Sequence, residues 1–311
     1  MQPMRRRATP MALLALSAGI ATASAGRISP GLDPATASTG PYAHAAGVLT
    51  RYRVWGTKGR PIVLLHGFVE STDVWTRVAP LLARDHRVIA IDLRGFGYSE
   101  RRGPYSAASM ADQVTALLQQ LHVTQPLLVG HSMGAGVLAE LARRDPRAIR
   151  GMIFADGDGL ADGSGGPLGS VASGPVAAIA LALALSSDAL MRSILRGAYG
   201  PSHPRLTHAL IERWRRPLRV RGTAGALAAM TKQGGIGLTR DELPSARHVP
   251  SALIWGQFDS LPIETGRFAA RALGGSPIWT IAGAGHLTPL THPARFAELV
   301  ERFERQLDAR S

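Results

Sequence analysis

The sequence predicts an α/β fold with a mostly parallel central sheet, helices on both faces of that sheet, and an inserted helical cap. From residue 48 to residue 156, short apolar runs alternate with segments of helical spacing. Over residues 157–246 this alternation stops, and no segment has the pattern of a strand. Strand patterns return before a C-terminal amphipathic helix. Strands that are apolar along their whole length are typical of a parallel sheet covered on both faces.

The core elements follow one another with short connections. The segments with a strand pattern are 48–55, 61–65, 87–91, 126–129, 152–155, 252–255 and 277–281. The segments with helical spacing are 74–83, 110–121, 133–143 and 293–307. The helix over 133–143 ends before Asp145-Pro146, because proline cannot continue helical hydrogen bonding. We therefore assign 48–156 and 247–311 to one α/β core.

The predicted cap interrupts this core. Residues 157–173 are rich in glycine and serine, and residues 176–185 form an unbroken apolar run. Helical patterns follow near 189–195, 207–214 and 224–230. We interpret 157–246 as a helical cap whose glycine-rich start forms a hinge. The apolar run is interpreted as core packing, with the lining of an apolar substrate pocket as the alternative.

The composition excludes several classes of protein. The chain has 311 residues, of which 45% are hydrophobic, so it can bury a large core and is not a disordered protein. It has no cysteine, which excludes disulfides, thiolate metal sites and a cysteine nucleophile. The net charge is +13, but the arginines are scattered and only 5% of residues are aromatic. We therefore expect no nucleic-acid partner.

The N-terminal residues have the pattern of an export signal. Arginines at 5–7 precede the apolar run 11–20, and Ala23-Ser24-Ala25 fits a signal-peptidase cleavage site. The run is shorter than the roughly 20 residues of a membrane-spanning helix. We expect a signal peptide over 1–25, cleaved after Ala25 or retained as an anchor, and a flexible leader over 26–47. The protein is then exported to the periplasm, the cell surface or the medium.

The strongest chemical signal is the pentapeptide Gly-His-Ser-Met-Gly at 130–134. It has the pattern G-x-S-x-G and lies between an apolar strand and a helix, which is the context this motif requires. Small residues on both sides of Ser132 permit a tight turn. The serine hydroxyl then projects above the carboxyl edge of the sheet, where open α/β sheets bind ligands. We predict that Ser132 is the nucleophile.

A serine hydroxyl is a weak nucleophile and needs a base. His286 is the predicted base, because it lies in a glycine-containing loop after a strand and before the last helix. Asp259 follows the strand 252–255 and is the predicted acid that orients the base. The order serine, acid, histidine accompanies the G-x-S-x-G motif. Asp156, which also ends a sheet strand, is the alternative acid.

The predicted oxyanion hole uses backbone donors beside the nucleophile. Acyl transfer needs N–H groups aimed at the developing oxyanion. His66-Gly67-Phe68 closes a strand, and the glycine lets the chain approach Ser132 closely. We predict that the donors are the backbone N–H groups of Phe68 and Met133.

Residues 48–311 resemble the α/β-hydrolase superfamily, in its subgroup with a helical cap. The motifs that carry the resemblance are His66-Gly67-Phe68, Asp92-Leu93-Arg94-Gly95-Phe96-Gly97, the pentapeptide 130–134, Trp255-Gly256 with Asp259, and Gly285-His286. The resemblance implies the fold described above and a Ser-His-Asp triad. The serine at 132 departs from dehalogenases and epoxide hydrolases, which use an aspartate nucleophile. Similar serine motifs occur in esterases, lipases, cofactor-free perhydrolases and carbon–carbon bond hydrolases.

From these residues we predict an exported serine hydrolase that cleaves carboxylic esters with apolar acyl or alkyl groups through an acyl-enzyme. A carbon–carbon bond hydrolase or a perhydrolase on the same triad is an alternative. A non-catalytic binding protein on a hydrolase scaffold is another.

The expected partner is a small-molecule ester. No metal or organic cofactor is expected, because the sequence has no H-E-x-x-H motif and no nucleotide-binding glycine loop. A basic cluster near the end of the cap is interpreted as a solvated face, with peripheral contact to an anionic envelope as the alternative. Its members are Arg213, Arg215, Arg216, Arg219 and Arg221.

Overall fold

The computed structural model describes residues 31–157, 160, 187–232 and 236–309. Contacts divide the chain into two units, Met1–Gly31 and Leu32–Ser311, and every helix and strand described belongs to the second unit. The predicted signal peptide over 1–25 and the apolar run over 176–185 lie outside the described residues. Among the described residues, none of the helices combines the length and the apolarity needed to cross a bilayer.

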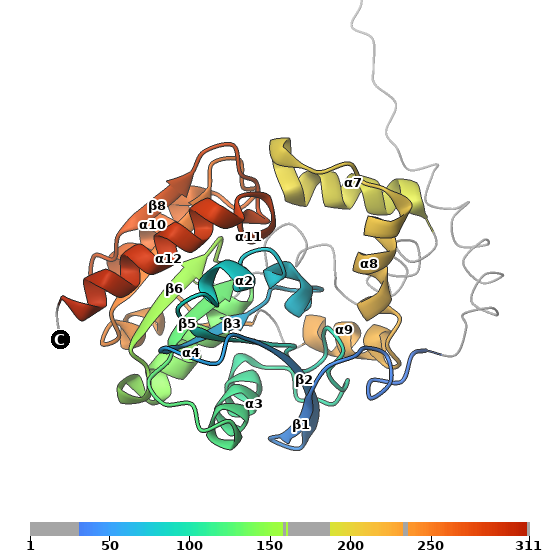
Figure 1. Ribbon diagram of the computed structural model, residues 1–311, viewed down its shortest axis with the longest axis horizontal. Helices are drawn as coiled ribbons and strands as arrows, with labels where there is room; N and C mark the ends of the chain where they lie inside the picture. Colours follow the sequence, from blue (N-terminus) through green and yellow to red (C-terminus); the bar gives the residue numbers. More distant parts are fainter. Residues whose placement is uncertain (1–30, 158–159, 161–186, 233–235, 310–311) are drawn as a thin grey trace, which may run out of the picture. The chain divides into compact units, whose positions relative to one another are not determined.

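A central sheet organises the second unit (Figure 1). Within the described residues it has eight strands, in the order β1-β2-β4-β3-β5-β6-β7-β8. β1 (Tyr42–Ala45) is antiparallel to β2 (Val48–Trp55), which is antiparallel to β4. The mutually parallel strands are β3 (Pro61–Leu65), β4 (Arg87–Ile91), β5 (Leu127–His131), β6 (Gly151–Ala155), β7 (Ser251–Gly256) and β8 (Ile278–Ile281). The carboxyl ends of these parallel strands therefore meet at one edge of the sheet.

Alternate residues of the central strands enter two separate apolar cores. In β3, Ile62 and Leu64 pack on one face, whereas Val63 and Leu65 pack on the other. The first face carries α2 (Ala79–Leu82) and α12 (Pro293–Asp308). The second face carries α3 (Ala107–Gln120), α4 (Gly134–Arg144) and α10 (Ile263–Ala272). The predicted fold class, a mostly parallel sheet with helices on both faces, is confirmed.

One predicted helix is interrupted. We expected helical structure over 74–83, but the structure has η2 (Thr72–Trp75) and then the separate short helix α2. Pro80 stands in the first turn of α2. Because proline has no backbone N–H, it fits the first turn of a helix and breaks a continuous one.

Helices α7 (Asp188–Tyr199), α8 (His208–Leu218) and α9 (Thr223–Lys232) lie between β6 and β7 in the chain (Figure 1). Arg215 on α8 is buried and lies 2.5 Å from the carboxylate of Asp188 on α7, so an ion pair joins the two helices. The stretch ends with η5 (Leu243–Ala246), where Leu243 packs in the core of the sheet. The segment expected to be a cap therefore contributes its last turn to the core.

The basic cluster of the cap is largely engaged with the protein itself. Arg215 and Arg219 pair with Glu212, and Arg221 lies 3.2 Å from Asp33. The guanidinium of Arg216 donates hydrogen bonds to the carbonyl of Ala37. These contacts favour a structural role for most of the cluster. Contact with an anionic envelope stays a prediction.

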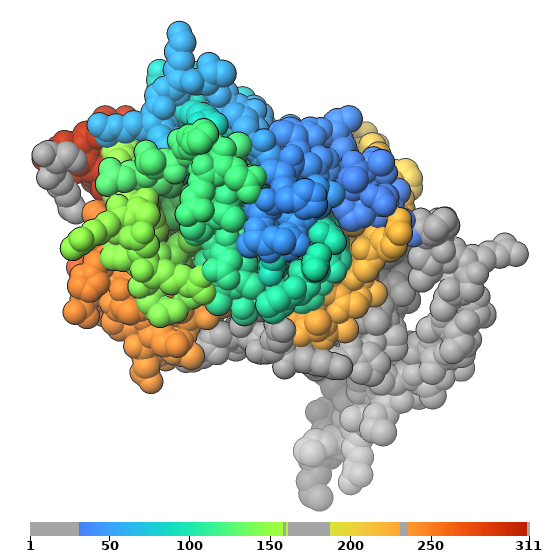
Figure 2. Space-filling model, turned by 90° about the horizontal axis from the view of Figure 1, so that it is seen from below, coloured from blue at the N-terminus to red at the C-terminus, as the bar shows by residue number. Residues whose placement is uncertain are grey.

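The expected flexible leader over 26–47 is partly wrong, because Tyr42–Ala45 form strand β1. The strand pairs with β2 and packs against α3, where the side-chain amide of Gln120 donates a hydrogen bond to the carbonyl of His44. Figure 2 shows this hairpin, in blue, beside α3 on one face of the molecule. The backbone hydrogen bonds of β1 are made with β2. This pairing cannot be recognised in the sequence of a segment rich in glycine, serine and proline.

Candidate active site

Ser132 lies on a strained turn between β5 and α4. Its backbone φ is 49°, a left-handed conformation that is rare outside glycine. A Cβ atom at Gly130 would lie 2.6 Å from the carbonyl oxygen of Gly134, and one at Gly134 would lie 2.6 Å from the carbonyl of Leu65. Only glycine fits at either position. The Ser132 N–H donates a hydrogen bond to the Ala155 carbonyl at 2.9 Å, which anchors the turn to β6.

Asp259 and His286 come together from the loops after β7 and β8. Nδ1 of His286 lies 3.0 Å from each carboxylate oxygen of Asp259. The two loops touch, since a Cβ atom at Gly256 would lie 2.1 Å from the carbonyl oxygen of Gly285. One Asp259 oxygen also accepts a hydrogen bond from the Leu261 N–H at 2.9 Å, which fixes the carboxylate.

The protonation state of His286 follows from this contact. Burial by itself lowers the pKa of His286, but the hydrogen bond and the charge of Asp259 outweigh it and raise the pKa above its ordinary value. Nδ1–H of His286 donates to the Asp259 carboxylate, so neutral His286 presents the lone pair of Nε2. Among the described residues, the Ser132 hydroxyl has no hydrogen-bond partner. Hydrogen bonds of this kind often form only when substrate binds.

Asp156, the alternative acid, is engaged elsewhere. It is fully buried, and it accepts hydrogen bonds from the N–H of Gly256 at 2.7 Å and from the hydroxyl of Thr288. Burial and the nearby charge of Asp259 raise the pKa of Asp156. Gly256 comes shortly before Asp259 in the chain, and Thr288 comes shortly after His286. Asp156 therefore braces both loops without contacting the His286 ring.

Phe68 and Met133, the predicted backbone donors, follow Gly67 and Ser132 in the chain. A Cβ atom at Gly67 would lie 2.8 Å from Cβ of Ser132, so the loop after β3 passes directly beside the predicted nucleophile. Among the described residues, the N–H groups of Phe68 and Met133 donate to no acceptor. The loop itself is held by His66, whose Nδ1 donates to the Gly67 carbonyl at 2.7 Å.

Glu70 is a site residue that the sequence reasoning missed. Its Oε2 accepts a hydrogen bond from the Gly67 N–H at 2.7 Å and lies 3.0 Å from Nδ1 of His131. Nε2 of His131 lies 2.8 Å from the main-chain carbonyl of His286. The sequence did offer one indication of its role, because Glu70 is an acid three residues after Gly67 in the loop that follows a buried strand.

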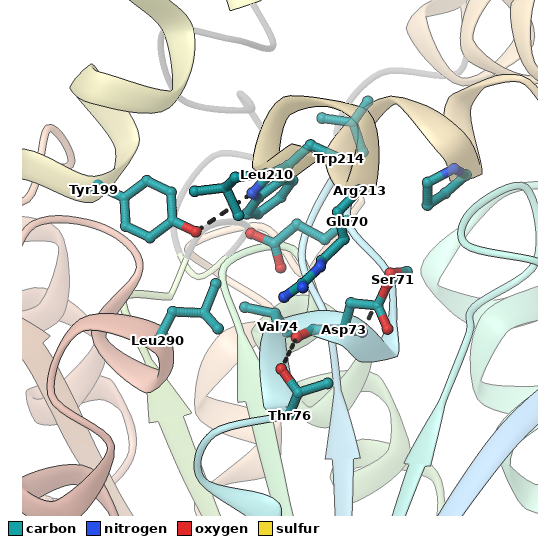
Figure 3. A pocket seen from close by; sticks show the side chains of 12 residues that line it. Glu70, Ser71, Asp73, Val74, Thr76, Tyr199, Leu210, Arg213, Trp214 and Leu290 are labelled. Atoms are coloured by element: carbon teal, nitrogen blue, oxygen red, sulfur yellow. Dashed lines mark hydrogen bonds between the residues drawn. The ribbon is translucent and has the colours of Figure 1, made fainter. Parts of the chain in front are cut away.

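A pocket borders the site on the side of the cap. Its cavity volume is about 30 Å³, and it is partly open to solvent. Ser132, Asp259 and His286 are not among its lining residues, and Val69 and Glu70 connect it to the site. Its other walls are Ser71, Asp73, Val74, Thr76, Tyr199, Leu210, Arg213, Trp214, Pro217 and Leu290 (Figure 3).

Among the described residues, one group has the arrangement of metal ligands. Donor atoms of Asp188, His208 and Glu212 lie within 4.8 Å of one another. Asp188 is already paired with Arg192 and Arg215. These ion pairs account for the cluster as a link between α7 and α8.

Comparison with known proteins agrees with this architecture. The family model described as alpha/beta hydrolase fold matches residues 60–186. An uncharacterised protein of Mycobacterium bovis is 30% identical over 275 residues, which cover 83% of this chain and 78% of that protein. The chain belongs to the α/β-hydrolase family.

Two characterised proteins are also similar. A 2-hydroxymuconate semialdehyde hydrolase of Pseudomonas sp. is 28% identical over 284 residues, covering 85% of this chain and 93% of that one. The solved structure of a thermophilic esterase from Thermogutta terrifontis has a TM-score of 0.69 at 25% identity, covering 87% of this chain and 99% of that one.

Proposed function

We propose that the protein is a serine hydrolase that cleaves carboxylic esters with apolar acyl or alkyl groups. The observation that carries the proposal is the contact of Asp259 with Nδ1 of His286, beside a serine on a strained strand-to-helix turn. A histidine oriented by a carboxylate is the arrangement that activates a serine hydroxyl. We also propose export, which rests on the N-terminal pattern alone.

In the proposed reaction, Ser132 Oγ attacks the ester carbonyl while Nε2 of His286 takes the hydroxyl proton. Asp259 holds the Nδ1 proton and stabilises the imidazolium that forms. The N–H groups of Phe68 and Met133 bind the oxyanion of the tetrahedral intermediate. His286 returns its proton to the leaving alcohol and then activates water, which releases the acid from Ser132.

The pocket beside the site supports an apolar group in the substrate. Val69, Val74, Leu210, Trp214 and Leu290 give it apolar walls. Each buried methylene of an acyl chain contributes roughly 0.8 kcal/mol to binding in such surroundings. The chain length that gives the highest activity therefore measures how much apolar surface the pocket offers the substrate.

Labelling with a fluorophosphonate tests the proposed nucleophile directly. The purified protein is expected to react once per chain, and the adduct is expected to map to Ser132 by peptide mass spectrometry. The Ser132→Ala variant serves as the control and should not react. A folded protein that is not labelled would favour the binding scaffold instead.

A carbon–carbon bond hydrolase is the second candidate, favoured by the similarity to the Pseudomonas hydrolase and by Arg213. Arg213 makes no ion pair with a described residue, and in Figure 3 its guanidinium extends into the pocket on the side of Asp73. A substrate with a carboxylate would find a cation there. Turnover of a vinylogous keto acid, lost in Arg213→Gln, together with no turnover of simple esters, would favour this candidate.

A further inference from the structure

One buried side-chain pair joins three loops of the site. Glu70, from the loop after β3, accepts hydrogen bonds from the Gly67 N–H at 2.7 Å and from Nδ1 of His131 at 3.0 Å. His131, the residue before Ser132, donates through Nε2 to the main-chain carbonyl of His286 at 2.8 Å. The oxyanion loop, the nucleophile turn and the loop of the base are thus connected through two side chains.

We propose that Glu70 and His131 form a positioning pair that holds the oxyanion loop and the His286 loop in place around Ser132, and that it does so only while His131 is an imidazolium. The inference rests on the proposed function. Both residues act through the loops they hold, and Glu70 also lines the pocket beside the site.

Proton counting gives the charge of His131. Burial raises the pKa of Glu70, but the charge and hydrogen bond of His131 outweigh it and hold the pKa below its ordinary value, so Glu70 is an ionised acceptor. The two ring nitrogens of His131 thus face a carboxylate oxygen and a carbonyl oxygen, and both nitrogens carry a proton. His66 is the contrasting case in the same site. Its Nε2 accepts a hydrogen bond from the Leu93 N–H at 3.0 Å, so only Nδ1 carries a proton and His66 is neutral. The same reasoning therefore assigns opposite charge states to the two buried histidines.

The groups that surround His131 favour its protonated, cationic form. The titratable groups that face it from neighbouring loops are Glu70, His66, Asp156 and His286. Burial lowers the pKa of His131, but the charge and hydrogen bond of Glu70, helped by Asp156 at 3.9 Å, outweigh it and raise the pKa to about 9. The charge of His131 also opposes protonation of His286, which favours the neutral base.

Loss of one ring proton from His131 would break one of its two hydrogen bonds. A neutral imidazole can donate through only one nitrogen, so either Glu70 or the His286 carbonyl loses its donor. A displacement of about 1 Å in a catalytic loop costs roughly 10²-fold in rate. Activity is therefore expected to fall at alkaline pH as His131 becomes neutral.

Glu70→Gln tests the pair, because it removes the charge while keeping the shape. We expect kcat on a nitrophenyl ester to fall roughly 10- to 100-fold. The alkaline limb of the kcat profile, near pH 9 in the wild type, is expected to move down by about one pH unit or more.

The matched control is Glu304→Gln. It removes the charge of Glu304 on α12, which pairs with Arg150 and whose Oε2 lies 2.9 Å from Nε2 of His86, the residue before β4. It should leave the pH profile unchanged, even where Tm falls. Wild-type kcat and an unshifted alkaline limb in Glu70→Gln would overturn the inference.

A measurement without turnover separates this inference from the proposed function. ¹⁵N NMR of the histidine rings is expected to show His131 with two ring protons up to about pH 9, and a lower titration in Glu70→Gln. The resonance is assigned by its absence in His131→Asn. A neutral His131 at pH 7.5 would overturn the inference, even if Glu70→Gln fails to fold. A cationic His131 in a protein without esterase activity would leave the pair standing and reject the ester hydrolase.

Discussion

Nδ1 of His286 lies 3.0 Å from both carboxylate oxygens of Asp259, although the two residues are 27 positions apart in the chain. Both follow parallel strands, and β7 and β8 are neighbours in the sheet. Their carboxyl ends bring the two loops to the same edge as Ser132. The contact fixes one tautomer of the imidazole and leaves Nε2 free to accept a proton.

The acid assignment is tested by comparing two aspartates. Asp259→Asn is expected to reduce kcat by roughly 10⁴-fold, by analogy with serine protease triads, because the amide cannot stabilise the imidazolium. Asp156→Asn is expected to cost less activity and more stability, since Asp156 binds Gly256 and Thr288 rather than the His286 ring. Steady-state kinetics and thermal unfolding of both variants check this. The reverse order of the kinetic effects would make Asp156 the acid.

The pH dependence of kcat/KM should have an acid limb set by His286. The base must be neutral to take the proton of Ser132, and its pKa is raised above 6.5. Activity is therefore full between the raised pKa of His286 and the alkaline limb, and it is lost as the pH falls through that raised pKa. Initial rates from pH 5 to 8 measure this limb. A limb centred below pH 6 would contradict the assignment of His286 as the base.

Gly67→Ala should impair catalysis through a steric clash. The added methyl would lie 2.8 Å from Cβ of Ser132 and 3.0 Å from the carboxyl carbon of Glu70, so the oxyanion loop has to move. We expect a loss of about 10²-fold in kcat. Gly197→Ala in α7 is the control, since its added methyl meets nothing within 4 Å. It should keep full activity and gain about 0.5–1 kcal/mol of stability.

Export predicts a defined mature N-terminus. Expression of the full chain in a bacterial host should release a protein that begins at Gly26, because cleavage after Ala25 follows the small–x–small pattern. Intact-mass spectrometry of the cell fractions checks this. An uncleaved chain confined to the cytoplasm would reject the signal peptide, whereas an uncleaved chain in the membrane fraction would indicate an anchor.

Elements with strong apolar runs were predictable from the sequence, whereas elements defined by their partners were not. Segments 61–65 and 87–91 coincide with β3 and β4. Strand β1 has little apolar pattern and depends on pairing with β2. Helix α10 was missed because the buried residues of its face are Gly266, Ala269 and Ala270, whose small side chains give a weak periodic signal.

The same difference separates the site residues that could be predicted from the sequence from those that could not. Ser132, His286 and Asp259 were singled out because their residue types, positions after strands and chain order are visible in the sequence. Glu70 was not, because its importance comes from an approach to His131 across 61 residues of chain. The charge of His131 was equally hidden, since it depends on which acceptors face the two ring nitrogens.

The proposed chemistry is tested most directly by initial rates of purified residues 26–311 on nitrophenyl esters from acetyl to palmitoyl, measured beside Ser132→Ala. The proposal predicts turnover that disappears in the variant, and the chain length of highest activity then measures the apolar pocket. No turnover on any ester by a folded wild-type protein would contradict the ester hydrolase and favour carbon–carbon bond cleavage or a binding role.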